Sequence, residues 1–522
     1  MVEAPINLTA NQDVVSTAET IRAALDRLPA QITEVTATSR EARRGAVFLA
    51  YPGASRDGRD YIGDAVSRGV SAVMFEAEAN SQFVWNADWK VPHIAVKNLK
   101  NFASFIAGQV YKSPSQNLWM VGVTGTNGKT SVTQWIAQAF RLAGKKSAVL
   151  GTIGNGLVGE LVPAENTTAD AVVLQRLLRE YVDAGASTCA MEVSSHGLEQ
   201  GRVAEVKFDI AVFTNLTRDH LDYHGTMEAY GAAKAKLFAL TGLKTAVVNV
   251  DDPFGRTLAD QLAARSNNGG IDVVRFACNG GSKVANLMAA DLSVSPAGLS
   301  FTVRCLGAVK NEARVDSAIL GAFNISNLLA VIGTLLASGI SLERAAQIAG
   351  GLTPVPGRMQ AVRSRGDSNK PLVVVDYAHT PDALEKALST LAAVVSDKGR
   401  LISVFGCGGD RDRGKRPLMG AISEQYADLT FVTSDNPRSE DANRIIADIE
   451  SGMKGASSRA YRLVADRQQA IYEALNAAHA GDIVLIAGKG HEDYQIIGES
   501  KQHFSDVEIA QEALAQWTGF AP

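Results

Sequence analysis

The stretch LWMVGVTGTNGKTS, residues 118–131, decides the fold of this chain. An apolar run with strand character breaks into GTNGKT at Gly125–Thr130, and an amphipathic helical pattern follows. Glycines let successive backbone N–H groups turn toward one anion, and the positive end of the following helix adds to the attraction. Lys129 can reach the outer phosphates of a nucleotide, and the Thr130 hydroxyl can bind Mg²⁺. The pattern therefore predicts a nucleotide-binding loop between a strand and a helix.

The match to the common phosphate-loop pattern is a variant. That pattern has glycine five residues before Gly128, where this chain has Val123, with Gly122 beside it. A Gly-Lys-Thr run alone also occurs in ordinary loops and at helix starts. The strand before the run and the helix after it favour nucleotide binding.

Length and composition indicate a multidomain globular protein. A chain of 522 residues is too long for one core, so about three domains are expected. A net charge of -4 and the lack of a basic block argue against a nucleic-acid partner. The sequence has neither a signal-peptide pattern nor an apolar run of the roughly 20 residues that a membrane span needs, which predicts a cytoplasmic protein. The widely spaced cysteines indicate neither a zinc site nor a disulfide framework: Cys189, Cys278, Cys305 and Cys407.

Short β-rich runs alternate with helical segments from about residue 115 onward. The first series of expected elements is strand 118–124, a helix from 129, strand 147–150, helix 171–184, strand 188–193 and strand 208–214. The second series has strands at 372–376, 401–405, 429–433 and 483–487, each followed by a helix. Such alternation is typical of parallel sheets covered by helices, which bind ligands at the carboxyl ends of their strands.

A Pro and Gly cluster at Pro354–Gly357 separates the two series and marks a domain boundary. Residues 1–114 also mix strand and helix, with the clearest strands at 46–51 and 71–75. We therefore predict an α/β protein of three domains. They are a small N-terminal α/β domain (1–114), a central phosphate-loop domain with a parallel sheet (115–354) and a Rossmann-like C-terminal domain (355–522).

Polar side chains suited to chemistry gather between residues 192 and 234. Glu192 follows an apolar strand, where its carboxylate would face bound phosphates. Three of the eight histidines fall in this stretch, and a carboxylate with an imidazole can hold a metal ion. Each residue alone could equally be a satisfied polar group or a helix cap, but together they favour a metal-phosphate site. The group comprises Glu192, Ser194, Ser195, His196, Asn215, Arg218, Asp219, His220, Asp222 and His224.

With these motifs in order along the chain, the sequence resembles the ATP-dependent Mur ligases, and most closely their branch of UDP-N-acetylmuramoyl-tripeptide synthetases. The similar stretches are TGTNGKTS at 124–131, NTT at Asn166–Thr168, EVSSHGLEQGR at Glu192–Arg202, the stretch Phe213–Phe238, GAFNISN at Gly321–Asn327, PVPGRMQ at Pro354–Gln360, DYAHTPDAL at Asp376–Leu384, GCGGDRDRGKRP at Gly406–Pro417, DNPR at Asp435–Arg438 and GKGHEDYQ at Gly488–Gln495. In the first domain only Ser39-Arg40 and Gly53–Gly58 are recognisable.

The resemblance implies an ATP site, a metal site and a modified lysine. ATP would be bound by Gly125–Ser131, Asn324 and Arg358, and His379 would lie on the nucleotide side. From the residues alone, Asn324 could also cap a helix at 325–337. Lys234 alone looks like one lysine on a surface helix, but in the family it is carbamylated, which turns a cation into a metal ligand. Two Mg²⁺ ions are implied, held by Thr130, Glu192, His220 and the carbamate of Lys234, and the implied catalytic residues are Lys129, Glu192, His220 and Lys234.

The resemblance also implies the substrate sites. A UDP-sugar peptide would contact Ser39, Ala54, Ser55, Arg56, Asn166, Thr167, Thr168, Ser194, Gln200 and Arg202. Meso-diaminopimelate would be bound by Arg411, Asp435, Asn436, Pro437, Arg438, Gly488 and Glu492. The DNPR run follows a predicted strand, where an arginine can hold a carboxylate with two parallel hydrogen bonds, although Asn-Pro-Arg alone could be only a turn.

The implied activity is ATP-dependent addition of meso-diaminopimelate to UDP-MurNAc-L-Ala-D-Glu through an acyl phosphate. We expect the enzyme to be a monomer with no nucleic-acid or membrane partner. His220 and His224 are both candidate general bases, but His220 is better suited to bind metal. A folylpolyglutamate or cyanophycin synthetase would share the loop and the chemistry, and a nucleotide-gated switch protein would share the loop and domain closure near Pro354–Gly357. The pairing of DNPR with EVSSHGL argues against the former.

Overall fold

The computed structural model describes residues 14–28, 32–53, 56–77, 83–266, 270–278, 282–295, 297–306, 311–362, 370–396, 398–453 and 460–519. The chain divides into two compact units. The first comprises Met1–Thr124, Gly144–Ala211 and Ala232–Lys244, and the second comprises Gly125–Ala143, Val212–Gly231 and Thr245–Pro522. Within the described residues, no helix has both the length and the apolar character needed to cross a membrane.

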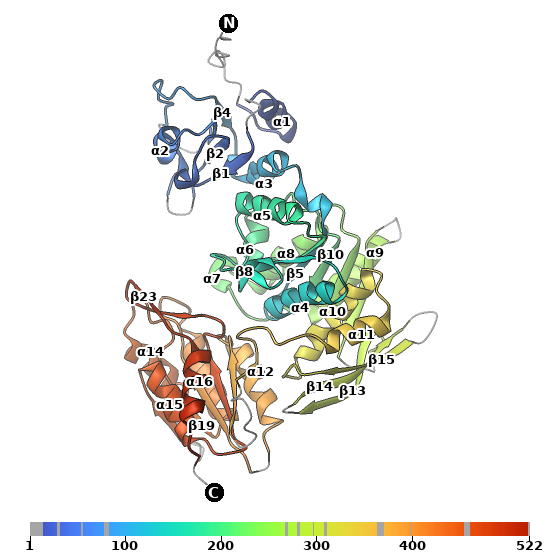
Figure 1. Ribbon diagram of the computed structural model, residues 1–522, viewed down its shortest axis with the longest axis vertical. Helices are drawn as coiled ribbons and strands as arrows, with labels where there is room; N and C mark the ends of the chain where they lie inside the picture. The colour runs from blue at the N-terminus through green and yellow to red at the C-terminus, as the bar shows by residue number, and fades with distance from the viewer. Residues whose placement is uncertain are drawn as a thin grey trace. The chain divides into compact units, whose positions relative to one another are not determined.

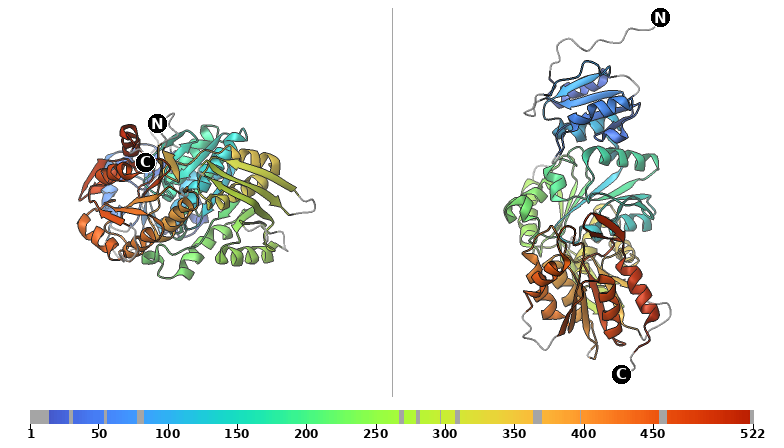
Figure 2. Two further views of the ribbon diagram at one scale, coloured as in Figure 1. Left: turned by 90° about the horizontal axis from the view of Figure 1, so that it is seen from below. Right: turned by 90° about the vertical axis from the view of Figure 1, so that its left-hand side faces the viewer.

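The N-terminal part of the first unit is a parallel sheet of four strands in the order β1-β2-β3-β4 with helices (Figures 1 and 2, blue). The elements are β1 (Glu34–Thr36), β2 (Ala46–Ala50), β3 (Ala72–Glu76), β4 (His93–Val96), α1 (Ala18–Asp26), α2 (Ile62–Ser67) and α3 (Leu99–Val110). The Glu76 carboxylate accepts the N–H groups of Asn98 and Leu99 at 3.0 and 2.8 Å, which caps α3. The strands predicted at 46–51 and 71–75 are confirmed as β2 and β3.

The rest of the first unit contains neighbouring strands in the order β5-β9-β6-β7-β8. Strands β5, β9 and β6 are parallel, and the hairpin of β7 and β8 extends them in antiparallel fashion. The elements are β5 (Trp119–Thr124), β6 (Ser147–Gly151), β7 (Gly154–Leu157), β8 (Glu160–Val162), β9 (Thr188–Glu192), α5 (Ala171–Asp183) and α6 (Ser195–Glu199). Strand β10 (Ile210–Phe213) and helix α8 (Met227–Ala235) each have residues in both units.

The second unit begins with α4, which follows the phosphate loop. Its elements up to residue 350 are α4 (Lys129–Leu142), α7 (Leu221–His224), α9 (Pro253–Ser266), α10 (Asn324–Ala337), α11 (Leu342–Gly350), β11 (Thr245–Asn249), β12 (Asp272–Ala277), β13 (Leu287–Ser295), β14 (Gly298–Cys305) and β15 (Asn311–Ser317). Strands β11, β12 and β13 are parallel, and β13, β14 and β15 form an antiparallel meander that the sequence patterns did not predict.

The C-terminal part of the second unit is a sheet of six strands in the order β16-β17-β21-β18-β19-β20, parallel except for β16. Its elements are β16 (Gln360–Val362), β17 (Leu372–Asp376), β18 (Leu401–Phe405), β19 (Leu429–Val432), β20 (Ala460–Leu463), β21 (Ile483–Ala487), α12 (Pro381–Ala392), α13 (Lys415–Tyr426), α14 (Ala442–Glu450), α15 (Arg467–Ala477), α16 (Asp506–Gln516) and the hairpin β22 (Tyr494–Ile497) with β23 (Ser500–His503). The predicted strands at 372–376, 401–405 and 483–487 are confirmed.

Alternate residues of these strands enter two different cores. Val374 and Leu485 pack with α12, α13 and α14 on one face, whereas Val373 and Val484 pack with α15 and α16 on the other (Figure 1, orange and red). Because successive side chains of a strand point to opposite faces, strands buried on both faces need continuous apolar runs. The Rossmann-like C-terminal domain and the three-domain α/β fold are therefore confirmed.

A fully buried ion pair supports the strand ends of this sheet. The Arg467 guanidinium donates to both carboxylate oxygens of Asp506 at 2.8 and 2.7 Å, and both side chains are completely buried. The same guanidinium donates to the carbonyl oxygens of Ser434 and Ala487 at 3.3 and 2.9 Å. Arg467 thus connects the starts of α15 and α16 with the carboxyl ends of β19 and β21.

Replacing Arg467 with Met should lower the free energy of unfolding by about 3–5 kcal/mol, because Asp506 is left as an uncompensated buried charge. Chemical denaturation of the variant and the wild type measures this difference. The double variant Arg467→Met with Asp506→Leu should recover much of the loss, because it removes both charges. A single variant as stable as the wild type would contradict a structural role for the pair.

Candidate active site

The phosphate loop is held by two residues that follow β10. The Asn215 side chain accepts the Asn127 N–H at 2.9 Å and donates to the Asn127 carbonyl at 3.0 Å. The Thr214 hydroxyl donates to the same carbonyl at 2.6 Å. Both backbone groups of Asn127 are therefore fixed, and with them the turn that precedes α4.

The cationic and hydroxyl groups of the loop lie at the start of α4. The Lys129 ammonium donates to the carbonyl oxygens of Gly125 and Thr126 at 2.9 and 2.8 Å. Thr130 and Ser131 are buried in the first turn. The predicted loop residues are thus together at a helix N-terminus, where backbone N–H groups and the helix dipole favour an anion.

Two asparagines on α10 adjoin this loop. A Cβ atom at Gly128, whose φ is +84°, would lie 2.6 Å from Asn327 Oδ1. Asn327 Nδ2 donates to Asn324 Oδ1 at 2.8 Å, and Asn324 Nδ2 donates to the Leu320 carbonyl at 2.7 Å. Asn324 is the first residue of α10, and no side chain caps this helix, so the interpretation of Asn324 as a cap is wrong.

Arg358 brings a second cation to the loop. Its Nη2 donates to the Thr130 hydroxyl at 3.2 Å, and its guanidinium lies 4.3 Å from the centre of the Tyr377 ring. His379 is nearby in sequence, and its Nδ1 lies 2.8 Å from the Tyr377 carbonyl oxygen. Burial and the Lys415 ammonium lower the pKa of His379 to about 4, so its ring is neutral at neutral pH.

A contact from α12 also reaches the loop. Asn127 Nδ2 donates to Asp382 Oδ2 at 2.6 Å, and the Lys386 ammonium donates to the same oxygen at 3.0 Å. Asp376, at the end of β17, accepts the N–H groups of Met359 and Ala378 at 2.7 and 2.9 Å. Burial raises the pKa of Asp376. Asp376 and Asp382 were not among the predicted site residues, although both belong to the DYAHTPDAL stretch.

Glu192 is the last residue of β9 and is almost completely buried at 1% exposure. Its Oε1 accepts the Thr152 N–H at 2.8 Å, and its Oε2 accepts the Thr152 hydroxyl at 3.2 Å. A Cβ atom at Gly151 would lie 2.2 Å from Oε1, so a larger residue here would displace the Glu192 carboxylate.

Lys234 is also buried, at 1% exposure, so the interpretation of a surface lysine is wrong. The stretch Tyr230–Ala235 of α8 has small residues on several sides, and the sequence pattern therefore does not distinguish a buried face. A neutral amine is the form of lysine that reacts with CO2, which is the chemistry that the predicted carbamate requires.

The predicted histidines lie around α7. His220 has a φ of +52°, and its Nε2 lies 3.3 Å from Asp219 Oδ2. The His224 ring centre lies 5.1 Å from that of Tyr230, whose hydroxyl accepts from Thr126 Oγ1 at 3.3 Å. His224 is thus connected to the phosphate loop through Tyr230.

The predicted metal ligands fit a hard cation by chemistry. The set of a hydroxyl, a carboxylate, an imidazole and a carbamate offers mainly oxygen donors, which Mg²⁺ prefers. Glu192 and Lys234 belong to the first unit, and Thr130 and His220 to the second. In the part of the chain that the structure describes, no group of three or more His, Cys, Asp or Glu side chains could hold a metal ion. The predicted set instead combines Glu192 and His220 with a threonine and a modified lysine.

Several residues predicted to bind the UDP-sugar peptide lie beside Glu192. The Thr168 hydroxyl donates to the Glu192 carbonyl at 3.0 Å and accepts the Ser194 N–H at 3.0 Å. Arg202 Nη1 donates to the Thr168 carbonyl at 2.6 Å, and its Nε and Nη2 donate to Gln200 Oε1 at 2.9 and 2.7 Å. The four predicted residues therefore form one hydrogen-bonded group, which consists of Thr168, Ser194, Gln200 and Arg202.

The other predicted residues of this site are more scattered. Thr167 Oγ1 accepts from the Thr152 hydroxyl at 3.0 Å, while Asn166 is exposed. Ser39 is buried and Arg56 is exposed in the N-terminal part. The predictions for Ala54 and Ser55 lie outside the described residues.

The predicted amino-acid site lies at the carboxyl ends of β18, β19 and β21. Arg438 has a φ of +52°, and its Nη1 donates to the Gly409 carbonyl at 2.8 Å. Its backbone N–H donates to the Ile496 carbonyl at 3.1 Å, and its carbonyl accepts the Gly498 N–H at 2.8 Å. The β22–β23 hairpin therefore holds the backbone of Arg438. A Cβ atom at Gly409 would lie 1.9 Å from the Pro437 carbonyl oxygen, so the two loops are in close contact.

Glu440 connects the DNPR loop to the loop that carries Arg411. Its carboxylate accepts from both Nη atoms of buried Arg416, at 2.8 and 3.0 Å, and from the Asp410 N–H at 2.6 Å. Hydrogen bonds from Arg416 and the Asp410 backbone lower the pKa of Glu440 to about 2. Arg411 itself is exposed, so its guanidinium is accessible to an anionic ligand.

Glu492 and Asn436 face each other across the same site. Asn436 Nδ2 donates to Glu492 Oε2 at 3.0 Å. Gly488 has a φ of +118°, and a Cβ atom there would lie 3.6 Å from Asp435 Oδ2. The predicted residues Asp435–Arg438, Gly488 and Glu492 are therefore brought together, although Asn436 and Glu492 are 56 residues apart in the sequence.

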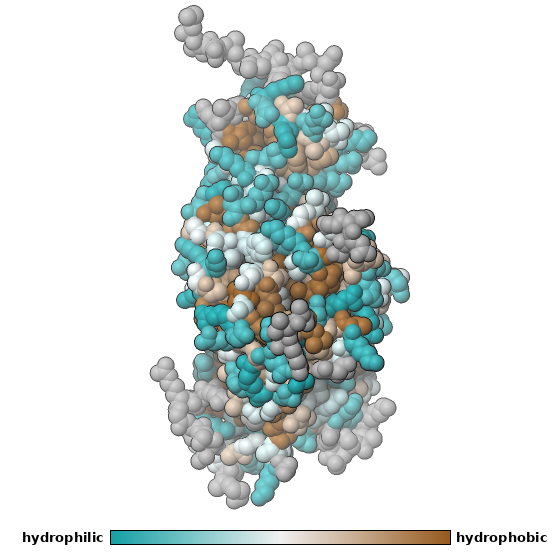
Figure 3. Space-filling model, turned by 90° about the vertical axis from the view of Figure 1, so that its right-hand side faces the viewer, coloured by the Kyte–Doolittle hydropathy of each residue, from teal (hydrophilic) through white to brown (hydrophobic). Residues whose placement is uncertain are grey.

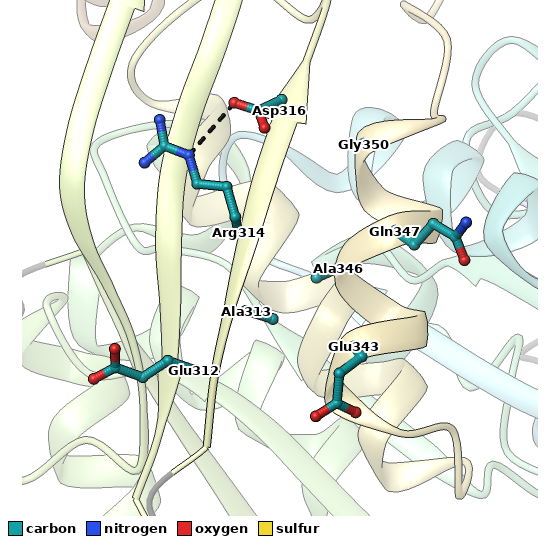
Figure 4. A pocket seen from close by; sticks show the side chains of 8 residues that line it. All are labelled: Glu312, Ala313, Arg314, Asp316, Glu343, Ala346, Gln347 and Gly350. Carbon is teal, nitrogen blue, oxygen red and sulfur yellow. Dashed lines mark ion pairs between the residues drawn. The ribbon is translucent and has the colours of Figure 1, made fainter.

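A cavity of about 480 Å³ lies between β15 and α11 and contains none of the predicted site residues (Figure 4). Glu312, Arg314 and Asp316 come from the strand, and Glu343 and Gln347 come from the helix. Arg314 Nε lies 3.4 Å from Asp316 Oδ1. A cluster of acidic side chains without further evidence of a ligand does not define a binding site.

The protein surface mixes apolar and polar side chains. On the face drawn in Figure 3, brown apolar areas are interrupted by teal polar side chains. The exposed large apolar residues of the described chain include Val162 on β8, Leu292 on β13 and Leu418 on α13. Single exposed apolar side chains are common on proteins and need no binding role.

A phosphate loop, a central parallel sheet and a C-terminal Rossmann-like domain are together typical of nucleotide-binding α/β proteins. The family model of the Mur ligase family catalytic domain matches residues 31–111, that of the Mur ligase middle domain matches 123–335, and that of the Mur ligase glutamate ligase domain matches 357–490. The chain belongs to the Mur ligase family.

Three similar proteins share one name. The UDP-N-acetylmuramoyl-L-alanyl-D-glutamate--2,6-diaminopimelate ligase of Chromobacterium violaceum is 50% identical over 95% of this chain and 97% of its own length. The protein of the same name from Ectopseudomonas mendocina is 48% identical over 93% and 96%. A solved structure of a ligase with that name has 37% sequence identity and a TM-score of 0.65, and the match covers 93% of this chain and 95% of the other.

Gly128→Ala should weaken ATP binding strongly, because the new methyl group would press against Asn327 and strain the loop. The matched control is Gly144→Ala, at the other end of α4. Gly144 has a similar φ of +81°, but a Cβ atom there meets nothing within 4 Å. Calorimetric titration with ATP measures both variants. Equal losses of affinity would mean that backbone strain, and not the Asn327 contact, determines the effect.

Proposed function

We propose that this chain is an ATP-dependent ligase that adds meso-diaminopimelate to the D-glutamate γ-carboxylate of UDP-MurNAc-L-Ala-D-Glu. The products would be UDP-MurNAc-tripeptide, ADP and phosphate. The observation that carries this proposal is the arginine at the end of DNPR, held over the Gly408–Gly409 turn, in a chain about 50% identical to a ligase named for 2,6-diaminopimelate. An arginine can bind the distal carboxylate of diaminopimelate with two hydrogen bonds, and lysine has no such carboxylate.

The proposed division of the chain assigns one substrate to each domain. Residues 1–114 would bind the UDP-sugar, 115–354 would bind ATP, and 355–522 would bind the amino acid. Contacts of Arg358 and Asp382 with the phosphate loop support cooperation between the ATP and amino-acid parts of the second unit. We further propose a monomer in the cytoplasm, where ATP and the nucleotide-linked substrate occur.

Lys129 and Arg358 would stabilise the phosphoryl group during transfer. Both cations lie at the first turn of α4, where negative charge develops on the γ-phosphoryl oxygens. Thr130, Glu192, His220 and the carbamate of Lys234 would hold Mg²⁺, which would neutralise phosphate charge. To bind phosphates, the Lys129 ammonium would have to exchange its two carbonyl acceptors in the loop for phosphate oxygens.

The proposed reaction has two steps. The D-glutamate carboxylate oxygen bonds to the γ-phosphorus while the bond to the β,γ-bridging oxygen breaks, which yields an acyl phosphate and ADP. The amine of diaminopimelate then attacks the acyl carbon, and the tetrahedral intermediate loses phosphate and a proton to give the amide. An unactivated carboxylate lacks a leaving group, so the first step makes the second one possible.

Phosphate release with defined mixtures of substrates tests the function. It should require ATP, UDP-MurNAc-L-Ala-D-Glu and meso-diaminopimelate together, and L-lysine or L-ornithine should not replace the diaminopimelate. Release with ATP alone would favour a nucleotide-gated switch protein. Activity with a folate and glutamate would favour a folylpolyglutamate-type ligase.

Lys234→Ala should reduce ATP turnover by about 100-fold or more, because a negative metal ligand is lost. Short carboxylic acids such as acetate should restore part of the activity by occupying the space of the carbamate. Lys236→Ala is the matched control, because the Lys236 side chain is 51% exposed. An unimpaired Lys234→Ala enzyme would exclude the proposed modification.

Arg438→Ala should reduce turnover with meso-diaminopimelate by about 100-fold or more, because the distal carboxylate loses a paired, charged donor. Calorimetry should show unchanged ATP binding. Arg444→Ala, an exposed arginine on α14, serves as the control. Equal losses of amino-acid use and ATP binding would mean that the amino-acid pocket lies elsewhere.

A further inference from the structure

Lys489 is a fully buried cation within the proposed amino-acid site. Its side chain has 0% exposure, and it follows Gly488 at the carboxyl end of β21. Its ammonium donates to Asn436 Oδ1 at 2.9 Å and to the Tyr494 carbonyl at 2.7 Å. Burying an ammonium group costs free energy unless it is paired and hydrogen-bonded, so the partners of Lys489 indicate its role.

The bonds of Lys489 fix the orientation of the Asn436 amide. Asn436 Oδ1 accepts from the Lys489 ammonium and from the Ile496 N–H at 3.0 Å. The amide nitrogen therefore points the other way and donates to Glu492 Oε2. A reversed amide would place its N–H₂ against two donors and its oxygen against a carboxylate.

Lys489 also lies between two carboxylates of the site. Its ammonium is 3.4 Å from Asp435 Oδ1 and 3.5 Å from Glu492 Oε2. Asp435 Oδ1 is buried and accepts no hydrogen bond. Burial and the Asp435 charge raise the pKa of Glu492, and Lys489 opposes this effect. The group around Lys489 thus has two acidic side chains beside one lysine.

We propose that Lys489 is a positioning residue that prepares Asp435, Asn436 and Glu492 to bind the distal ammonium of the added amino acid. This inference depends on the proposed function, because it assumes a substrate with a second amino-acid centre. Arg438 would bind the distal carboxylate, and the two acidic side chains would bind the adjacent ammonium. Lys489 does not contact the substrate and acts through its neighbours.

Lys489→Met, which removes the charge and is only one heavy atom shorter, tests the proposal. Phosphate release is measured with meso-diaminopimelate and with 2-aminopimelate, which lacks the distal amino group. The variant should raise the KM for meso-diaminopimelate by about tenfold or more and reduce the preference over 2-aminopimelate by a similar factor. The KM for ATP should not change.

Two further variants separate positioning from folding. Leu485→Ala removes a fully buried side chain from the apolar core of β21 and should lower the melting temperature without changing the preference. Lys489→Gln keeps a hydrogen-bond donor, so it should fold even if Lys489→Met does not. Because it lacks the charge, it should still lose the preference for meso-diaminopimelate. A wild-type preference in the folded Lys489 variants, or an equal shift in Leu485→Ala, would overturn the proposal. Failure of the proposed function would appear separately, as a wild-type enzyme that does not use meso-diaminopimelate.

Discussion

The amide of Asn215 bonds both backbone groups of Asn127, and the phosphate loop depends on this constraint. A loop that binds phosphates must hold its N–H groups in place before the nucleotide arrives, because ordering them on binding would cost affinity. Once Asn127 is fixed, Gly128 lies against Asn327 and Thr130 meets Arg358. The proposed ATP site thus combines the loop, the segment after β10, α10 and the residues that follow Pro354–Gly357.

The proposed amino-acid site is stabilised differently, by buried charges at strand ends. Arg467 holds the carbonyl oxygens of Ser434 and Ala487, and Arg416 holds Glu440. Lys489 supports Asn436 from inside the domain. These cations are expensive to bury, but each one fixes loop groups in a set geometry through directional hydrogen bonds. Such a site can distinguish amino acids by the placement of charge, which an apolar pocket cannot do.

The sequence predicted the parallel strands well because they are buried on both faces and therefore need continuous apolar runs. Strands β17, β18 and β21 have the predicted bounds. The β13–β15 meander was missed because its mixed polar residues carry no such run. The burial of Lys234 was missed as well, because the small residues of α8 do not mark a buried face. The resemblance to a family, and not the helix pattern, assigned that lysine to the site.

Long-range polar contacts were equally invisible in the sequence. Asp382 lies 255 residues from Asn127, and Arg467 meets Asp506 from a different helix. Asn215 belonged to a recognised polar group, but its role in holding the loop follows only from the two hydrogen bonds. The sequence motifs predicted which segments form the candidate site, whereas the structure shows which charged and amide side chains hold those segments in place.

The transfer of an isotope label tests the central claim most directly. UDP-MurNAc-L-Ala-D-Glu labelled with ¹⁸O in the D-glutamate γ-carboxylate is incubated with ATP, meso-diaminopimelate and the enzyme, and the released phosphate is analysed by mass spectrometry. An acyl phosphate intermediate predicts that each phosphate carries one oxygen from the labelled carboxylate. Phosphate without the label would show that the carboxylate is not phosphorylated, and the account of this site as a ligase would be wrong.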